Sequence, residues 1–473
     1  MSITRSFLCA LPLFGGVVAF SAMGQTAQRG GYVVAIDSES AKHPAWTRVA
    51  QALCEKHSGR IEVYPKGNVD TLLPQLRKSA PRHVCFVSAP ECVGRELVVG
   101  AAQLIRRIDD DPFGDALWGI VTGYDAADAL RMASHSEPFV VRNAATSMGG
   151  VGFFKEWDGG FASDEGNRNR FWVKGQDGQA ICRHVEPDQA ESLADAFNTI
   201  SVDYWCTSGH ASERNWQIVY NQNAGFIVHK NGFLYSRDTS GALFPILSLN
   251  PKVYVAAGNC LIGHIDKQDC MTTAWMHSGG VSQMVGYTVV TFYGFMGWGV
   301  KSLFESGRHS LAEAFFLNNQ ILLWKLNRLN PKLRDRRIDP KGKFSTREMI
   351  VSMNGIVKTK DELGLFWDRD TVAFYGDPAW DVRCPEKRRD IDVAIDGRNI
   401  TVRFLREVKF PDSIDSKDMR PVGVLLSTPS SGSSIVSANS GAALDGAVVT
   451  DFFALMPITG THAKGETLKF RFE

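Results

Sequence analysis

The sequence has neither an excess of charge nor a run of apolar residues in its body long enough to cross a membrane. Its 473 residues include 52 Lys and Arg against 51 Asp and Glu, a formal charge of +1. This balance gives no electrostatic footprint for nucleic acid, which we do not expect as a partner, and leaves no acidic tail. After the N-terminal region, no segment approaches the roughly 20 consecutive apolar residues of a membrane-spanning helix. With 44% hydrophobic and 22% charged residues, the composition indicates a globular protein of two or three domains.

Several catalytic and metal-binding signatures are also absent. The sequence contains no C-x-x-C pair with zinc spacing, no H-E-x-x-H and no G-x-S-x-G, which weighs against zinc peptidases and serine hydrolases. The segment GWGVKS near 297–302 lacks the glycine–lysine spacing of a phosphate-binding loop. Nine cysteines spread over so long a chain do not form the framework of a disulfide-stapled miniprotein.

The N-terminus has the layout of a secretory signal peptide. In MSITRSFLCALPLFGGVVAFSAMGQ, Arg5 precedes an apolar run that ends in small residues. Ala22 and Gly24 fit the positions before a cleavage site, so we expect a signal peptide at residues 1–24. A membrane anchor is the alternative, but Pro12 interrupts the short run. We therefore expect an extracytoplasmic protein, secreted or periplasmic, with no membrane span after cleavage.

The pattern along the chain predicts two kinds of domain. Short apolar runs such as YVVAID and HVCFVS alternate with helical segments, which predicts an α/β domain over 25–385, a parallel sheet with helices on both faces. A finer division would give two subdomains, about 25–180 and 181–385. Residues 151–175 are rich in glycine and charge and read as a surface loop. From 386 to 473 the alternating segments predict a small all-β sandwich.

Two predicted strands end in glycine just before a chemically capable residue. VDYWCTSG leads to His210, and KVYVAAGN leads to Cys260. Functional groups gather at the carboxyl ends of strands in open α/β sheets. A cysteine becomes nucleophilic as the thiolate, which a neighbouring histidine can generate before donating a proton to the leaving group. The backbone N–H groups of Ala211 and Cys260 are suited to stabilise an oxyanion.

Three segments together resemble the catalytic domain of gingipain-type cysteine peptidases, of the caspase and legumain clan. TSGHASERNW is similar to their histidine motif, VYVAAGNCLIG followed by SGGVSQMVGYTVVTFYG to their nucleophile segment, and FYGDPAWDVR to a Gly-Asp-Pro segment near the domain end. The resemblance spans roughly residues 30–385, and extends to the tail by architecture alone. It implies a caspase-like fold followed by an immunoglobulin-like sandwich, with Cys260 as nucleophile, His210 as base and acid, and the N–H groups of Ala211 and Cys260 as the oxyanion hole.

The resemblance predicts an exported cysteine endopeptidase that acts on protein or peptide substrates and uses no cofactor in its chemistry. The sequence departs from the family at Ala211, where glycine is usual, and at Asn259, where a small apolar residue is commoner. A predicted hairpin at GFIVHKNGFLYS lengthens the spacing between His210 and Cys260, and would act as a lid or block the site. A non-catalytic pseudopeptidase that binds a partner, and a thiol-dependent transpeptidase, are the alternative functions.

Four further features each have more than one interpretation. Glu213 orients the imidazole of His210 or is a solvated loop carboxylate. Trp216 lines a substrate subsite or packs in the core. His264 is an alternative partner for Cys260 or a structural residue. The acidic segment RRIDDDPFGD, with Asp109, Asp110, Asp111 and Asp115, holds a structural calcium ion, attracts a basic substrate side chain, or forms a solvated turn without EF-hand spacing.

Overall fold

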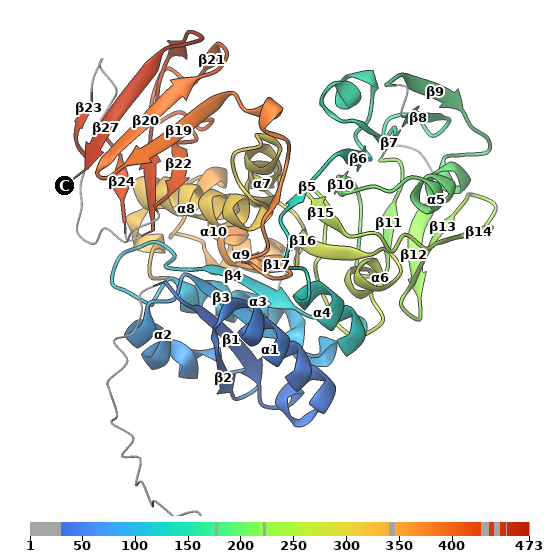
Figure 1. Ribbon diagram of the computed structural model, residues 1–473, viewed down its shortest axis with the longest axis horizontal. Helices are drawn as coiled ribbons and strands as arrows, with labels where there is room; N and C mark the ends of the chain where they lie inside the picture. The colour runs from blue at the N-terminus through green and yellow to red at the C-terminus, as the bar shows by residue number, and fades with distance from the viewer. Residues whose placement is uncertain are drawn as a thin grey trace, which may run out of the picture.

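The structure is a computed structural model that describes residues 30–175, 178–220, 224–339, 346–426, 435–438, 445–450 and 452–472 (Figure 1). The predicted signal peptide and its cleavage site lie outside these residues. None of the helices in the described part of the chain combines the length and apolar character that a membrane span requires.

A twelve-stranded sheet forms the centre of the protein, in the order β2-β1-β3-β4-β17-β16-β15-β10-β6-β7-β8-β9. Its first four strands are mutually parallel, with Val34 beside both Ile61 and Cys85. These strands are β1 (Tyr32–Asp37), β2 (Arg60–Tyr64), β3 (His83–Val87) and β4 (Leu117–Val121).

A second parallel set occupies the other half of the sheet and runs in the opposite direction. It consists of β6 (Asn143–Thr146), β7 (Gly159–Ser163), β10 (Tyr204–Thr207), β15 (Lys252–Ala256) and β16 (Val281–Tyr287). The strand β17 (Val372–Tyr375) joins the sets, parallel to β4 and antiparallel to β16. The strands β8 (Arg170–Lys174) and β9 (Ala180–His184) add an antiparallel edge. The α/β class is therefore confirmed, but the sheet is mixed where an entirely parallel one was expected.

Both parallel sets follow the same winding order. The order β2-β1-β3-β4 corresponds to the order β7-β6-β10-β15. In each set the strand that comes second in the chain lies at the outer end of the set, and the strand that comes first lies next to it. The strands β6 to β9 pair with the second set, and the expected subdomain boundary near residue 180 falls inside that set rather than between the two. Along the chain, the change from the first set of strands to the second falls between α4 (Ala126–Ala133) and β6.

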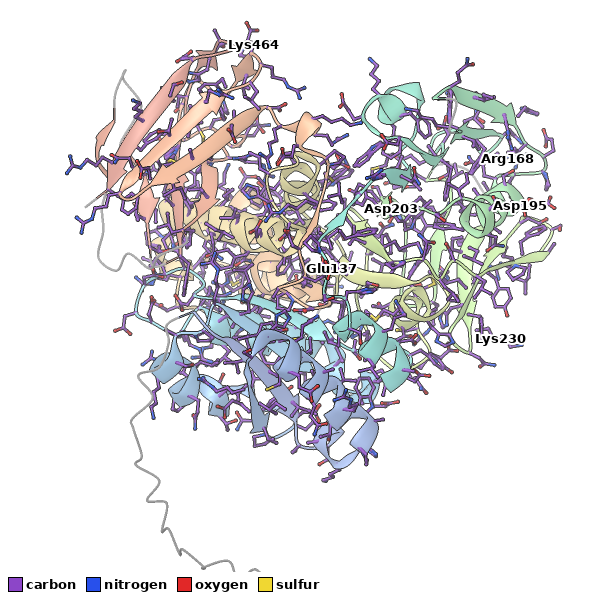
Figure 2. All side chains as sticks on the ribbon, viewed as in Figure 1. Glu137, Arg168, Asp195, Asp203, Lys230 and Lys464 are labelled. Carbon is purple, nitrogen blue, oxygen red and sulfur yellow. The ribbon has the colours of Figure 1, made fainter. Side chains whose placement is uncertain are left out.

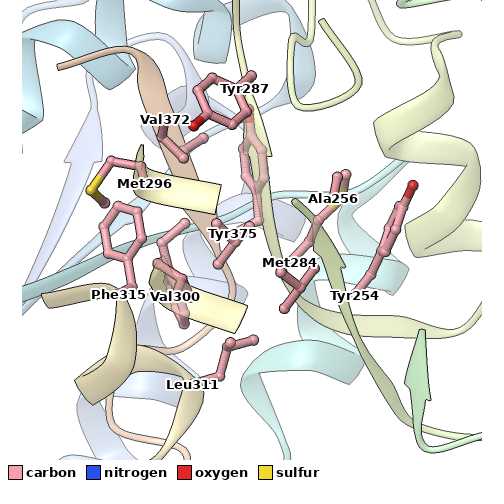
Figure 3. Packing of buried hydrophobic residues seen from close by; sticks show 14 of the residues in the cluster. Tyr254, Ala256, Met284, Tyr287, Met296, Val300, Leu311, Phe315, Val372 and Tyr375 are labelled. Atoms are coloured by element: carbon pink, nitrogen blue, oxygen red, sulfur yellow. The ribbon is translucent and has the colours of Figure 1, made fainter. Parts of the chain in front are cut away.

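Helices cover both faces, as the sequence pattern predicts. Because side chains alternate across a strand, Val34 and Ile36 join one apolar cluster and Val33 and Ala35 another. The first cluster includes α1 (Pro44–His57) and α4. The second includes residues of α2 (Leu73–Ser79), α3 (Pro90–Ile105), α5 (Ala190–Thr199), α6 (Met271–His277), α7 (Phe295–Glu305), α8 (Leu311–Leu329) and α10 (Lys360–Thr371). The remaining described α-helix, α9, spans Thr346–Ser352. Ser310 caps α8, and its side chain accepts from the Glu313 N–H. Figure 3 shows Tyr254, Met284 and Tyr375 in the larger core.

The prediction of a surface loop at 151–175 is wrong. This segment forms β7 and β8 with a short 3-10 helix, Val151–Glu156, before them. Phe161 and Phe171 are buried in the main core. The glycines that suggested a loop serve strand contact instead, because a Cβ at Gly160, whose φ is +136°, would lie 1.7 Å from the Ala144 carbonyl oxygen.

The segment between the predicted histidine and cysteine strands forms a separate antiparallel sheet. Its strands are β11 (Asn215–Gln217), β12 (Phe226–Lys230), β13 (Phe233–Arg237) and β14 (Leu243–Ile246). The expected hairpin is present, with Asn231 and Gly232 both at positive φ, the geometry of a tight turn that matches strand twist.

The described part of 386–473 consists of strands and one short 3-10 helix, Glu386–Arg388. One sheet contains β19 (Ile391–Asp396), β20 (Asn399–Phe404), β27 (Thr467–Phe472) and β23 (Ile435–Ala438), and another β22 (Val422–Leu425), β25 (Phe453–Met456) and β24 (Val448–Val449). Short two-stranded sheets pair β21 (Val408–Lys409) with β26 (Thr461–His462), and β5 (Phe139–Val140) with β18 (Val382–Arg383). The two larger sheets share a core of their own. Phe453 packs against Phe316 of α8, which braces this unit on the α/β body.

Candidate active site

The structure brings the segments that carry His210 and Cys260 to the same edge of the sheet. β10 and β15 are parallel neighbours, and Thr207 lies beside Ala256 at their carboxyl ends. His210 follows Thr207 by three residues and Cys260 follows Ala256 by four. The approach is close, because a Cβ on Gly258 would lie 2.7 Å from the Ser208 hydroxyl oxygen.

Asn259 connects the two segments directly. Its Nδ2 donates to the Gly209 carbonyl over 3.2 Å, and its Oδ1 accepts from the Thr207 hydroxyl over 2.5 Å. The same Thr207 oxygen lies 2.8 Å from the Tyr254 hydroxyl. Asn259 is fully buried, so these bonds satisfy an amide that would otherwise be costly to enclose. The residue before His210 is thereby bonded to the residue before Cys260.

Cys260 is half-buried in a loop held against the end of β16. The Thr291 N–H donates to the Cys260 sulfur over 3.3 Å, and the Thr291 hydroxyl donates to the Asn259 carbonyl over 3.1 Å. Leu261 has a φ of +58°, an uncommon value for a bulky residue, and its N–H donates to Val289 over 3.0 Å. A backbone N–H aimed at sulfur stabilises a thiolate, the reactive form of cysteine.

His210 is exposed and stacks on Tyr220, with ring centroids 4.6 Å apart and an interplanar angle of 16°. Tyr220 is itself fixed by its N–H bond to the Glu165 carbonyl, over 3.0 Å. Within the residues that the structure describes, His210 and Cys260 share no hydrogen bond. Contacts between catalytic groups are often long in unliganded enzymes and shorten when substrate binds.

Two backbone N–H groups of these segments have no acceptor in the described part of the chain, those of Ala211 and Cys260. Ala211 pairs with Trp216 in an isolated β-bridge, and the hydrogen bonds of this bridge are made by the neighbouring residues. The N–H of Ala211 is therefore not used by the bridge. Ala211 does not adopt a positive φ; Gly209 does, at +98°. Alanine therefore fits this position without the strain that would follow from a left-handed backbone.

Glu213 contacts a histidine other than the one it was predicted to orient. Its Oε1 lies 2.8 Å from Nδ1 of His264, and this hydrogen bond is the main cause of the lowered pKa of Glu213. His264 is thereby engaged by Glu213, and no bond joins it to Cys260 among the described residues. The pair instead links the loop after β10 to the loop after β15.

Trp216 does not line a subsite. Its side chain is buried, with 1% of its surface exposed, and its indole N–H donates to the Ser208 carbonyl over 2.9 Å. The residue therefore supports the loop that carries His210 from beneath. The core interpretation of Trp216 is the one that the structure supports.

The hairpin insert lies against α6 rather than acting as a lid. Asp269 accepts from the N–H groups of Asn231 and Gly232 at the turn, each over 3.1 Å. Phe233 contacts the ring of His277 at the end of α6. In Figure 2, Lys230 at the end of β12 lies on the outer rim of the molecule.

Among the residues that the structure describes, two side-chain clusters have a metal-ligand composition. Asp109, Asp111 and Asp115 place their carboxylates within 4.8 Å of one another, as do the ligand atoms of Asp125, Asp128 and His277. Burial, with the nearby Asp109 and Asp111 carboxylates, raises the pKa of Asp115 to about 9. Carboxylate oxygens at this separation fit a hard cation such as Ca²⁺.

Sequence reasoning noted Asn259 as a departure but missed its role, and missed Thr207, Thr291 and Tyr220. One signal was present: Thr207 and Asn259 are polar residues at the ends of otherwise apolar strands. A polar residue enclosed at such a position needs a partner, and the neighbouring strand end is the nearest source.

Comparison with known proteins identifies no family. No family model matches the sequence, and no curated protein matches it. One solved structure, described as "Structure of Protease", aligns with a TM-score of 0.37 and 8% sequence identity, over 93% of this chain and 94% of the other.

Proposed function

We propose that this protein is an exported cysteine endopeptidase in which Cys260 is the nucleophile and His210 the general base and acid. The observation that carries the proposal is the pairing of two strand ends. Parallel neighbours β10 and β15 present His210 and Cys260, joined through Asn259 and Gly209, and the backbone N–H groups of Ala211 and Cys260 have no acceptor among the described residues. The caspase-like character of the α/β body and the immunoglobulin-like character of the C-terminal unit belong to the same proposal.

The proposed reaction has two steps. The Cys260 sulfur, deprotonated by His210, attacks the scissile carbonyl carbon, and a C–S bond forms while the N–H groups of Ala211 and Cys260 stabilise the oxyanion. The C–N bond then breaks, and His210 gives its proton to the leaving amine. Water, losing a proton to His210, attacks the thioester carbon, the C–S bond breaks, and the carboxylic acid leaves as the thiol is restored.

The nucleophile, the base and acid, and the oxyanion donors in this scheme all come from the chain, and no cofactor is proposed for the chemistry. The structural calcium ion at Asp109, Asp111 and Asp115 stays a prediction. Export through residues 1–24, and the division into an α/β domain over 25–385 and a β unit over 386–473, are likewise proposed.

The decisive experiment compares cleavage of a fluorogenic peptide library by wild type, Cys260→Ala and His210→Ala. Cys182→Ala is the matched control, because Cys182 is an exposed free cysteine on the edge strand β9. We expect cleavage by wild type and by the control, and a loss of at least about 10³-fold in both site variants. Equal peptide cleavage by wild type and Cys260→Ala would contradict the peptidase proposal.

A second candidate function, a non-catalytic binding protein, is favoured by the stacking of His210 on Tyr220 without a bond to Cys260. Iodoacetamide labelling of the native protein separates the two. In the peptidase, Cys260 reacts faster near neutral pH than a model thiol; in a binding protein it does not. Adding an amine nucleophile to the cleavage assay tests the transpeptidase alternative, which would yield ligated products instead of free acids.

A further inference from the structure

A cavity of about 740 Å³ lies apart from the candidate active site. Asp37 at the end of β1, Tyr64 at the end of β2 and the residues Pro90–Leu97 at the start of α3 line it, whereas His210 and Cys260 do not. In the order β2-β1-β3-β4 the chain winds outward in opposite directions from β1 and β3. The carboxyl ends of such a strand pair form the crevice in which doubly wound sheets bind ligands.

One part of the cavity wall is apolar and belongs to the buried core. Tyr64, Val69, Val93 and Leu97 contribute to its walls and are each at least nine-tenths buried. The Asp37 carboxylate beneath them is fully engaged, since it accepts from the Ser40 and Ser88 hydroxyls. The volume falls in the range that encloses a drug-sized ligand, and exceeds what a single ion or a small amine needs.

The charges around the mouth are not balanced. The cations have partners: Lys66 donates to the Glu91 carbonyl, Arg95 to the Thr288 carbonyl, and Arg337 lies 3.6 Å from Asp70. By contrast, the carboxylates of Glu91 and Glu96 are exposed and have no partner in the described part of the chain. A bond to a neutral carbonyl leaves the charges of Lys66 and Arg95 in place, but six carboxylates line the cavity against three cations, so the formal charge of the lining is negative.

One wall of the cavity belongs to the loop that follows Cys260. His264, Ile265 and Asp266 line the cavity, and His264 is four residues from Cys260. Four extended residues span at most about 14 Å, which bounds the distance between the backbones of Cys260 and His264. Glu213 contacts His264 and Arg214 contacts Asp266, so the loop that carries His210 is attached to the same wall.

We propose that this cavity binds a polypeptide segment that carries lysine or arginine, with the apolar stem of the side chain inside and its charge at Glu91 and Glu96. Long basic side chains combine an apolar stem with a cationic end, which matches this distribution. A short polypeptide also fits the volume. The proposal concerns binding alone, so it stands or falls independently of catalysis at Cys260.

The test measures binding to Cys260→Ala protein, which prevents cleavage of the probe. A fluorescein-labelled nonapeptide of alternating arginine and alanine is titrated and followed by anisotropy, with a glutamate–alanine nonapeptide as the charge control. We expect the basic peptide to bind and the acidic one not to. The substitutions Glu91→Gln and Glu96→Gln together should weaken binding about fivefold. Asp412→Asn, which removes an exposed carboxylate in the C-terminal unit, should leave it unchanged.

The position of the peptide is tested by protection of Cys92. This half-buried thiol lines the cavity, and burial raises its pKa, so it alkylates slowly. Saturating basic peptide should reduce alkylation of Cys92, measured by mass spectrometry, while the exposed Cys182 reacts as before. Equal binding of both peptides, equal weakening by Asp412→Asn, or an unprotected Cys92 would each overturn the proposal.

Discussion

Asn259 donates a hydrogen bond from its side-chain amide to the carbonyl of Gly209, over 3.2 Å. Each of these residues directly precedes a candidate catalytic residue, so the bond sets the distance between the His210 and Cys260 loops. The Thr207 hydroxyl completes the link by donating to Asn259 Oδ1. In a site where reacting groups must be held within a fraction of an ångström, such a link is a means of preorganisation.

Replacing Asn259 with alanine is expected to uncouple the two loops. The buried Thr207 hydroxyl and the Gly209 carbonyl would each lose a partner, at a cost in the free energy of unfolding of about 1–3 kcal/mol. We expect kcat/KM for peptide cleavage to fall about 100-fold, with the loss mainly in kcat. The pH–rate profile of Cys260 alkylation should shift toward higher pH, because His210 no longer supports the thiolate.

Asn318→Ala provides the matched control for that experiment. Asn318 is also a fully buried asparagine, and its Nδ2 donates to the carbonyls of Phe295 and Met296. A comparable loss of stability, measured by chemical denaturation, should leave the alkylation profile of Cys260 unchanged. If both variants alter the profile equally, Asn259 contributes only stability.

Ala211→Gly is expected not to improve activity. Glycine is usual at this position in the family that the motif resembles, but Ala211 does not adopt a positive φ and its N–H has no acceptor among the described residues. In the proposed mechanism this N–H already serves as the oxyanion donor, so kcat/KM should change by no more than about twofold. Glycine increases the flexibility of the unfolded chain, so the free energy of unfolding should fall by about 0.4–1 kcal/mol. A large gain in kcat/KM would show that the alanine side chain obstructs the site.

The strand ends at the candidate site were predictable because their signal is local. Apolar runs that end in glycine before His210 and Cys260 became β10 and β15, and Lys230-Asn231-Gly232 became the expected turn. Backbone conformation within a few residues is governed by sterics and by turn chemistry, which the sequence states directly.

Contacts between distant segments were not predictable in the same way. The direction of β17 reverses the second set of strands relative to the first, and no local pattern specifies that pairing. Glu213 is only three residues from His210, yet its partner is His264, 51 residues away. The glycines at 159 and 160 resemble a loop until Ala144 is placed beside them. Each of these outcomes depends on which element lies next to which.

Asp115 is expected to make the protein less stable as the pH rises. Burial and the carboxylates of Asp109 and Asp111 raise its pKa to about 9, so in the folded state it stays protonated over a range where the unfolded chain releases the proton. Its contribution to stability is complete below about pH 4 and declines toward pH 9, by at most about 1.4 kcal/mol per pH unit. Asp115→Asn should remove this slope, measured by denaturant unfolding from pH 4.5 to 8.5.

The same variant tests the calcium prediction. If Ca²⁺ binds at Asp109, Asp111 and Asp115, millimolar Ca²⁺ raises the Tm of wild type near pH 8 and has a smaller effect on Asp115→Asn. Equal shifts in both proteins would place calcium elsewhere, and no shift would leave the cluster as a protonated acidic turn.

Glu213→Gln separates a structural contact from a role in catalysis. The hydrogen bond from His264 lowers the pKa of Glu213, so its stabilising contribution is present above about pH 4.3 and disappears as the pH falls through the lowered value. The variant should lose about 1 kcal/mol of unfolding free energy at pH 7, and the difference from wild type should shrink as Glu213 becomes protonated at acidic pH. Since Glu213 contacts His264, the pH–rate profile of Cys260 alkylation should keep its shape. A profile that shifts as it does in His210→Ala would show that Glu213 acts on His210 after all, through a movement of the loop that brings the carboxylate to the imidazole.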